Sequence, residues 1–310
     1  MTSSAAPDTI FVSIASYCDP LLDFTVRSAF GQASRPERVV LAIIEQQVPD
    51  LRLRVPERWA PQVRSVHLDP LQARGACWAR ALAMTLYQGE RWFLQIDSHT
   101  WFEPGWDERL VRWGHACQAL NPRCLITTYP NPFRLVNGQP CAELVGRQVL
   151  AHVVKPDEVF AQSHPTLMFE AVPVASEQPI YGLHVAGGFL FAPGTVVNAL
   201  PYDPFLYFHG EEQSFALRAW THGWDIFHIP GVPLYHHYVP PTGSGRPMHG
   251  SPELNAAAGA RLRALLWDGG NLGIYGLGTV RSLAEFAAFS GIDYAARHIA
   301  PSAYKARFGY

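Results

Sequence analysis

The 310-residue chain lacks the sequence features of proteins that bind nucleic acids or associate with membranes. Its formal net charge is −2, and no block of five like charges would attract a nucleic acid or an anionic lipid surface. No apolar run reaches the roughly 18 residues of a membrane span. Residues 1–9 lack the basic and apolar segments of a secretory signal. We therefore expect a cytoplasmic protein with no nucleic-acid partner and no membrane span.

Cysteines are also few, and they are scattered along the chain. The five residues form no C-x-x-C pair, and they are Cys18, Cys77, Cys117, Cys124 and Cys141. An odd number at such spacing argues against a disulfide framework or a structural zinc site. Reduced thiols are the simpler interpretation. Hydrophobic residues, in contrast, make up 48% of the chain and charged residues 16%, which is enough for a sizeable core.

Short β-rich runs alternate with amphipathic helical patterns, which predicts an α/β fold around a mostly parallel sheet. Strands are expected at 10–16, 38–46, 63–68, 91–96, 124–129, 148–153, 187–192 and 224–229. Helices are expected at 20–30, 75–88, 106–120, 211–222, 257–267 and 279–289. Asp19 is the expected N-cap of the first helix, with Pro20 at its first position.

Residues 8–240 form the predicted core, and residues 241–310 form a C-terminal loop with a helical cap. Within the core, residues 130–179 are rich in proline and polar turns, and only one strand is expected there. We interpret this stretch as an excursion that faces the acceptor of a reaction, with Phe133, Arg134 and Phe160 among the contacts.

An Asp-Ser-His sequence follows the predicted strand at 91–96. In open α/β sheets, ligands collect beyond the carboxyl ends of the strands. Asp97 and His99 place a carboxylate and an imidazole on one short segment, which suits a divalent cation. The tripeptide alone is weak evidence for a metal site, because the same residues can occur at a polar strand end that binds no metal.

His236 or His237 supplies a candidate third ligand. One carboxylate and two neutral imidazoles would leave a bound divalent cation with a net charge near +1, which favours an anionic ligand such as a diphosphate. A surface loop with aromatic neighbours is the alternative interpretation of this pair of histidines.

Three further groups are candidates for ligand contact. Arg74 and Arg80 flank the start of a predicted helix whose free amides suit a phosphate, although such arginines are often only solvated. Gly187 and Gly188 would permit close approach of a ligand, or mark a bulge. Glu211 and Glu212 could orient sugar hydroxyls, or only complement a helix dipole.

Several segments together, in order and spacing, resemble a known family. They are I-F-V-S-I-A-S-Y, R-G-x-C-W-A-R, F-L-Q-I-D-S-H, P-G-W-D, A-G-G-F-L-F, H-G-E-E-Q-S-F-A-L-R-A-W-T-H-G-W and L-Y-H-H-Y. They closely resemble the N-acetylglucosaminyltransferases that modify hydroxyproline in a cytosolic ubiquitin-ligase subunit. More distantly, they resemble the mucin-type polypeptide N-acetylgalactosaminyltransferases. The similarity runs from about Ile10 to about Tyr238.

This resemblance implies a GT-A fold, a UDP-sugar donor, Mn²⁺ or Mg²⁺ as the cation, and transfer with retention at the anomeric carbon. It implies that Asp97, His99 and His236 hold the metal, with His237 still possible for the third position. The following residues match positions that hold uridine or the donor: Ser13, Ser16, Tyr17, Glu45, Arg74 and Arg80. The transferred sugar and the acceptor would meet Gly187, Gly188, Glu211 and Glu212, although the relatives' G-E-N reads G-E-E-Q here.

The sequence therefore predicts a metal-dependent retaining glycosyltransferase. It would move N-acetylglucosamine or a similar sugar from UDP to a hydroxyl on a protein, a peptide or a small molecule, with Glu211, Glu212 and Arg80 as catalytic residues. A nucleotide-sugar-binding protein without turnover and a UDP-sugar hydrolase are the alternatives.

Overall fold

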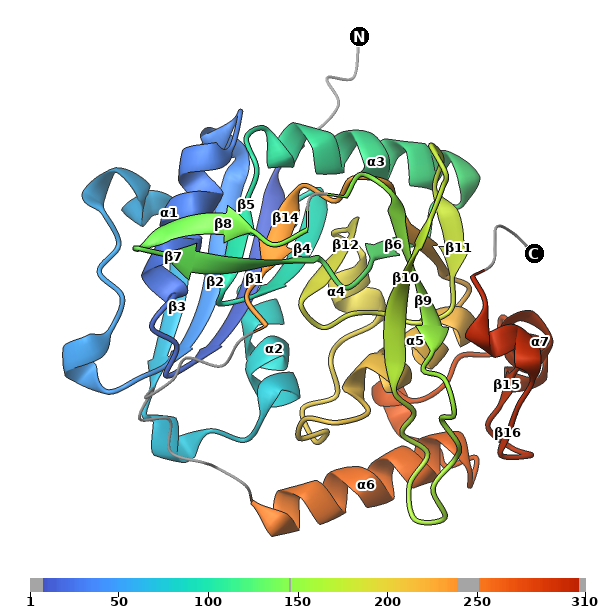
Figure 1. Ribbon diagram of the computed structural model, residues 1–310. Coiled ribbons are helices and arrows are strands. Elements are labelled where there is room, and N and C mark those ends of the chain that lie inside the picture. Colours follow the sequence, from blue (N-terminus) through green and yellow to red (C-terminus); the bar gives the residue numbers. More distant parts are fainter. Residues whose placement is uncertain (1–7, 145, 239–250, 307–310) are drawn as a thin grey trace, which may run out of the picture.

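A computed structural model describes residues 8–144, 146–238 and 251–306, with helices on both faces of a large sheet (Figure 1). The eight strands of this main sheet are β1 (Ile10–Tyr17), β2 (Val39–Gln46), β3 (Val63–Leu68), β4 (Trp92–Asp97), β6 (Cys124–Thr127), β11 (Ile180–Gly182), β12 (Phe189–Pro193) and β13 (Asp225–His228). They lie in the order β11-β13-β6-β12-β4-β1-β2-β3. Neighbours are parallel at β1/β2, β2/β3, β1/β4 and β6/β13, and antiparallel at β4/β12, β6/β12 and β11/β13. The predicted α/β fold with a mostly parallel sheet is confirmed.

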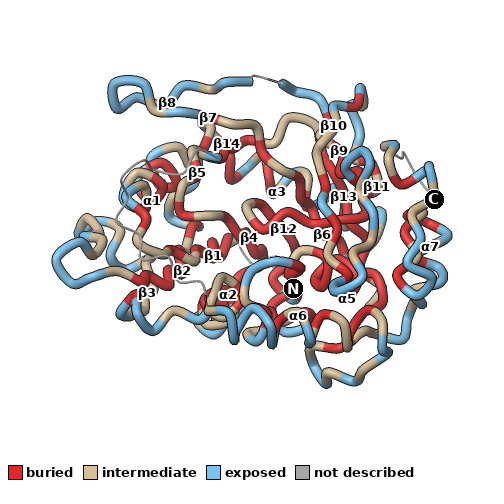
Figure 2. The backbone as a smooth tube through the Cα atoms, turned by 60° about the horizontal axis from the view of Figure 1, so that its bottom comes forward, coloured by how far each residue is buried: buried red, intermediate tan, exposed pale blue. Residues whose placement is uncertain are grey.

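Alternating side chains of the central strands explain why both faces of the sheet are covered. In β1, Phe11 contributes to one hydrophobic cluster, whereas Ile10, Val12 and Ile14 contribute to another. Successive side chains of a strand point to opposite faces, so a continuous apolar run needs a helix layer on each side. The backbone coloured by burial shows these strands as the most buried part of the fold (Figure 2).

The helices form one layer on each face. The cluster around Val12 includes side chains of α1 (Leu22–Gln32) and α3 (Trp106–Leu120). The cluster around Phe11 includes side chains of α2 (Ala76–Met84), α4 (Val196–Ala199), α5 (Glu211–Thr221), α6 (Pro252–Leu266) and α7 (Leu283–Ser290). The C-terminal helices therefore share the core that covers the α2 face. Short 3₁₀ turns span 36–38, 49–51, 57–62, 70–72, 273–275 and 301–304.

Residues 130–179 contain more regular structure than the sequence predicts. A second sheet has the order β5-β14-β7-β8 and consists of β5 (Thr100–Phe102), β14 (Leu234–His236), β7 (Asn131–Val136) and β8 (Gln139–Ala142). A separate hairpin pairs β9 (Val149–Val154) with β10 (Phe169–Val174), and β15 (Ile292–Asp293) pairs with β16 (His298–Ile299). The prediction of an irregular stretch with one strand is wrong, because pairing with β14 stabilises a proline-containing strand that local propensity disfavours.

Phe133 of β7 belongs to the interior and not to an acceptor surface. Its side chain is 1% exposed, and its ring stacks on that of Phe24 at 5.8 Å between centroids. Arg134, the next residue, is exposed, as alternation along a half-buried strand requires. Phe160 packs edge-on against Tyr294 at 5.3 Å between centroids.

Two local predictions also fail. Asp19 is not the N-cap of the first helix, since α1 begins at Leu22; its Oδ1 accepts from the Leu21 amide, and its Oδ2 accepts from the segment after β4. The helix expected over 75–88 ends at Met84, and the next three amides bond three residues back, to Leu82, Ala83 and Met84. The loop expected at 240–252 falls largely outside the described residues.

All five cysteines are free thiols. Across the parts of the chain described above, no helix combines the length and the apolarity needed to cross a bilayer.

Candidate functional site

One cavity of about 670 Å³, called here the main cleft, opens beside the carboxyl ends of β1, β2 and β4. Nine of the residues selected from the sequence line it: Tyr17, Arg80, Asp97, His99, Gly187, Gly188, Glu211, Glu212 and His236. They come from segments spread along the chain from Tyr17 to His236. The fold therefore collects most of the predicted chemistry in one place.

Strand register explains how Asp97, His99 and His236 meet. Asp97 is the last residue of β4, and β5 begins one residue after His99. His236 of β14 pairs with Thr100 of β5 in an antiparallel ladder, which brings it beside the Asp-Ser-His segment. Nε2 of His236 lies 3.0 Å from Oδ2 of Asp97, and Nε2 of His99 lies 3.9 Å from the same oxygen. One ligand atom from each of the three residues lies within 4.8 Å of the others.

Asp19 fixes the orientation of His99. Its Oδ2 accepts hydrogen bonds from Nδ1 of His99 at 2.6 Å and from the Ser98 hydroxyl at 2.7 Å. A carboxylate can only accept, so the proton of a neutral His99 lies on Nδ1, and the lone pair of the ring lies on Nε2, on the side of Asp97. Carboxylates behind metal-binding histidines are a recurrent arrangement.

Arg80 supplies the positive charge next to Asp97. The guanidinium is almost fully buried and donates to Asp97 Oδ1 at 3.3 Å, to the Gly187 carbonyl at 3.2 Å and to Glu211 Oε1 at 3.5 Å. Burial alone would raise the pKa of Asp97, but the hydrogen bond with His236 and the charge of Arg80 hold it well below the usual range. Asp97 is therefore an anion at neutral pH, as a metal ligand must be.

The glycine pair lies against these charged groups. Phe189 of β12 pairs with Ile96 of β4, which brings Gly188 beside Asp97. A Cβ atom on Gly188 would lie 3.1 Å from Asp97 Oδ2 and 3.1 Å from Cδ2 of His236. A Cβ on Gly187 would lie 2.8 Å from the Arg80 guanidinium. Both positions therefore need the small residue for close approach, and not for a special backbone angle.

Glu212 is held by a buried polar network. Its Oε1 accepts from the Gly187 amide at 2.6 Å, and its Oε2 lies 3.3 Å from both the Tyr129 hydroxyl and Nε2 of His184. Burial would raise the pKa of Glu212, but the hydrogen bond and charge of His184 and the hydrogen bond from the Gly187 amide lower it overall. Burial and the neighbouring Glu212 charge raise the pKa of Glu211 instead. The two adjacent carboxylates therefore have different electrostatic environments.

Four predicted residues do not line the main cleft. Ser13 is buried in β1, and Ser16 is buried with its carbonyl accepting from Gln46. Glu45 accepts from the Leu53 amide at 2.7 Å and pairs with His67, and it faces a different cavity. Arg74 lies near the ring of Trp78, with 6.0 Å from its guanidinium carbon to the centroid.

The alternative third ligand, His237, also points elsewhere. Its ring lies edge-on to Phe133 at 5.4 Å between centroids, while its amide donates to the His99 carbonyl at 3.1 Å. Adjacent residues of a strand face opposite sides, so only one of the two histidines can face Asp97. In this structure that residue is His236.

Other cleft residues were not selected from the sequence. They are Ala15, Asp19, Gln46, Ala73, Gly75, Ala76, Ser98, Tyr207, Phe208, His209 and Asn255. Gln46 is the last residue of a predicted strand, and Asp19 follows another. Their positions at the carboxyl ends of strands could have identified them as candidates from the sequence. The segment 207–209 has no such signal. Its place depends on a long-range contact, in which the Ala76 amide donates to the Tyr207 carbonyl at 3.0 Å.

Comparisons with known proteins bear on the fold and the family of this chain. No curated protein matches the sequence. Among solved structures, GalNAc-T7 with UDP, GalNAc and Mn²⁺ is similar over 91% of this chain and 54% of its own, with 15% identity and a TM-score of 0.64. This chain thus spans about half of that protein, and the similarity is one of GT-A fold. TarS of S. aureus is similar over 74% of this chain and 36% of its own, with 12% identity and a TM-score of 0.48.

A family model described as glycosyltransferase (GlcNAc) matches residues 9–55 and 50–245. The two matches together cover the main sheet, both helix layers as far as α5, and every residue of the Asp97, His99 and His236 group. The chain therefore belongs to the glycosyltransferase (GlcNAc) family.

Proposed function

We propose that this protein is a metal-dependent, retaining glycosyltransferase that moves N-acetylglucosamine or a similar sugar from a UDP-sugar to a hydroxyl group. The observation that carries the proposal is the convergence of Asp97, His99 and His236 within 4.8 Å in a cleft that also contains Arg80 and the glycine pair. The diphosphate of a UDP-sugar is an anion that a cation bound at this site would attract. Family membership supports the transfer reaction, and GalNAc-T7 was crystallised with UDP and Mn²⁺.

The chemistry of the three side chains fits a divalent cation. One carboxylate and two imidazoles form a donor set that suits Mn²⁺, with Mg²⁺ as the harder alternative. Asp19 gives His99 the tautomer that a ligand needs, and Gly188 leaves the space above Asp97 open. When bound, the cation would neutralise charge that develops on the departing diphosphate.

The side chains of the cleft have distinct roles in this proposal. Tyr17 and Gln46, at the ends of β1 and β2, would contact the uridine. Arg80 holds Asp97 and Gly187 in place and adds positive charge near the donor. Glu211 and Glu212 would orient sugar hydroxyls. We assign no ligand contact to Ser13, Ser16, Glu45 and Arg74, which lie outside the main cleft.

Retention at the anomeric carbon requires no covalent nucleophile if the acceptor attacks from the side of the leaving group. The new carbon–oxygen bond then forms as the bond to the diphosphate breaks, and a diphosphate oxygen takes the acceptor's proton. Proximity of the two substrates supplies much of the rate enhancement in such a step.

For the acceptor we propose a hydroxyl on a protein or peptide, with hydroxyproline as the first candidate because of the sequence resemblance. The exposed residues of the β7–β8 hairpin would contact it. The five free thiols suit a reducing compartment, which supports a cytoplasmic location.

The test is incubation of purified protein and Mn²⁺ with a panel of UDP-sugars, with and without cell lysate, while UDP release and labelled products are followed. We expect UDP-N-acetylglucosamine to label a macromolecule. Equal UDP release without lysate, with free sugar as product, would identify a hydrolase. Binding of UDP-sugar with no product under any condition would identify a binding protein.

A further inference from the structure

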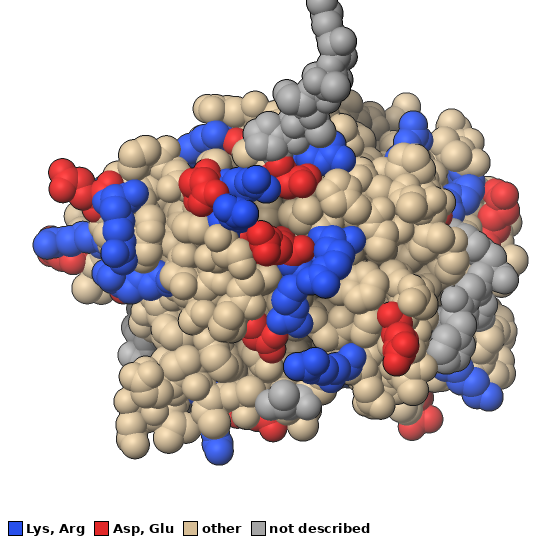
Figure 3. All heavy atoms as spheres, turned by 90° about the horizontal axis from the view of Figure 1, so that it is seen from above, with Lys and Arg blue, Asp and Glu red and all other residues tan. Residues whose placement is uncertain are grey.

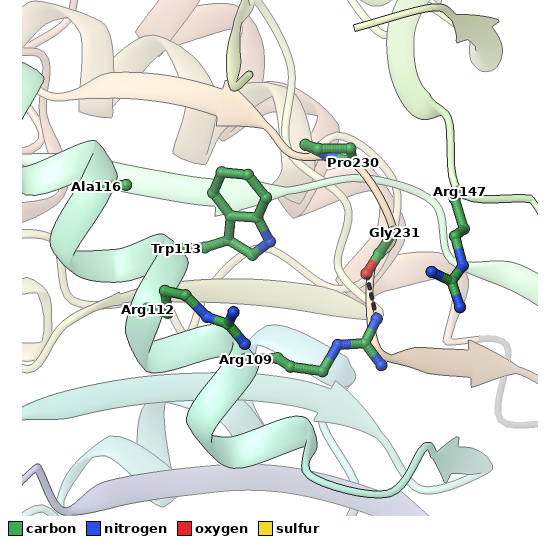
Figure 4. Close-up of a pocket in the computed structure, with 7 residues that line it drawn as sticks. All are labelled: Arg109, Arg112, Trp113, Ala116, Arg147, Pro230 and Gly231. Carbon is green, nitrogen blue, oxygen red and sulfur yellow. Dashed lines mark hydrogen bonds between the residues drawn. The ribbon is translucent and has the colours of Figure 1, made fainter. Parts of the chain in front are cut away.

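A second cavity, of about 550 Å³, lies on the α3 side of the main sheet. We call it the arginine pocket. Its principal lining residues are Arg109, Arg112, Trp113, Arg147, Pro230 and Gly231 (Figure 4). It shares no lining residue with the main cleft. The helix layers explain the separation, because α3 packs into one hydrophobic cluster and the cleft helices α2 and α5 into the other.

Positive charge exceeds negative charge at this pocket. Arg109 is anchored, since it pairs with Glu103 and donates to the Gly231 carbonyl at 2.9 Å. Arg112 and Arg147 are exposed, and neither has an ion-pair or hydrogen-bond partner within the described parts of the chain. Arg109 and Arg112 are three positions apart on α3, where like charges repel one another. Near the centre of this face several basic side chains lie close together, with acidic side chains beside them (Figure 3).

Trp113 adds an apolar plane to the charged groups. Its indole is partly buried against the core cluster of α3, and its ring lies between the helix and the turn at Pro230 (Figure 4). Indole faces pack well against planar groups, and guanidinium groups bind phosphate and carboxylate through paired hydrogen bonds. The two kinds of surface lie side by side in one concavity.

We propose that the arginine pocket is a binding site for a small organic anion in which a phosphate or carboxylate lies next to a planar apolar group. Arg112 and Arg147, from two separate segments, bind the anionic group, and Trp113 packs on the planar part. The volume is in the range of pockets that hold small molecules. This site is independent of the proposed sugar transfer.

Phenyl phosphate and benzoate are the probes, and benzyl alcohol is the uncharged comparison. NMR of the tryptophan indole N–H groups follows binding without added metal, with the Trp113 signal assigned through Trp113→Phe. We expect phenyl phosphate or benzoate to shift that signal to saturation while benzyl alcohol does not. Tighter binding of phenyl phosphate assigns the pocket to phosphates, and tighter binding of benzoate assigns it to carboxylates.

The double variant Arg112→Gln/Arg147→Gln should raise the dissociation constant at least about tenfold, the loss expected from removing one charge-assisted hydrogen bond. Both side chains are exposed, so the variant should keep its melting temperature. Arg58→Gln is the matched control, because the guanidinium carbon of Arg58 lies 4.4 Å from the ring centroid of Trp59 and Arg58 does not line the arginine pocket. The proposal is wrong if the double variant binds as tightly as the wild type, or if benzyl alcohol shifts the Trp113 signal as strongly as the anions.

Discussion

Replacement of Asp19 by asparagine isolates the support behind the proposed metal site, because Asp19 itself is not a ligand. Its side chain is 1% exposed, and its two oxygens accept from three donors: Leu21 N at 2.9 Å, Ser98 Oγ and His99 Nδ1. Burial would raise the pKa of Asp19, but the hydrogen bond and the charge of His99 lower it overall. The residue is therefore a buried carboxylate that holds three neighbours.

Asparagine has nearly the same shape but only one acceptor oxygen. In either orientation of the amide, its NH₂ group faces at least one of the three donors. A buried donor without a partner costs about 1–3 kcal/mol of the free energy of unfolding. The imidazole of His99 also loses the carboxylate that keeps its proton on Nδ1. Loss of such a partner weakens metal binding by about 10–100-fold, which corresponds to about 1.4–2.7 kcal/mol.

Calorimetry of Mn²⁺ binding in the presence of UDP, together with urea unfolding, measures both effects. Asp23→Asn is the matched control, since Asp23 forms an exposed ion pair with Arg27 whose loss should cost under about 1 kcal/mol. If Asp19→Asn remains folded and binds Mn²⁺ as tightly as the wild type, the assignment of His99 as an oriented ligand is refuted.

Three further predictions concern the surroundings of the site. Gly188→Ala should weaken Mn²⁺-dependent UDP binding at least about tenfold, because the added Cβ crowds Asp97. Gly31→Ala is the control, since its Cβ would have nothing within 4 Å, and equal UDP affinities of the two variants would contradict this argument. Burial lowers the pKa of His228 to about 4, so the unfolded chain takes up this proton at a higher pH than the folded protein, and His228 should lower the free energy of unfolding by about 2 kcal/mol between pH 7 and pH 5. Urea titrations of His228→Gln should show a smaller loss of stability over this pH range; a loss equal to that of the wild type would show that the histidine is not buried as a neutral group. Tyr129→Phe removes a hydrogen bond to Glu212 and should lower kcat about tenfold with little change in KM for the donor; a change in KM alone would place Tyr129 in donor binding.

The sequence is most informative where chemistry and backbone pattern coincide. The Asp97 and His99 pair follows a strand, and the carboxyl ends of neighbouring parallel strands meet at one edge, so their presence in a cleft follows from the pattern alone. The choice between His236 and His237 does not follow, because it depends on the register between β14 and β5. A shift of one residue would exchange the two side chains.

Other features depend on contacts between distant segments, which no local pattern encodes. Asp19 resembles an N-cap by its position before a helix, yet its carboxylate bonds to residues about 80 positions away. Strand β7 has a proline at its second position, and it is ordered by pairing with β14 from the far end of the core. Neither Ser13 nor Ser16 lines the main cleft. Ser16 lies on the opposite face of β1 from the cleft residue Tyr17, whereas Ser13 lies on the same face but is buried further from the carboxyl end of the strand.

The central claim is that Asp97, His99 and His236 hold a cation that binds the diphosphate of a UDP-sugar. Calorimetric titration of UDP into metal-free protein, with and without Mn²⁺, tests it most directly when the wild type is compared with His236→Ala and His237→Ala. We predict that Mn²⁺ strengthens UDP binding in the wild type and in His237→Ala, and that His236→Ala loses this effect while it keeps its melting temperature. UDP affinity that is independent of Mn²⁺ in the wild type, or an unchanged Mn²⁺ effect in His236→Ala, would contradict the claim.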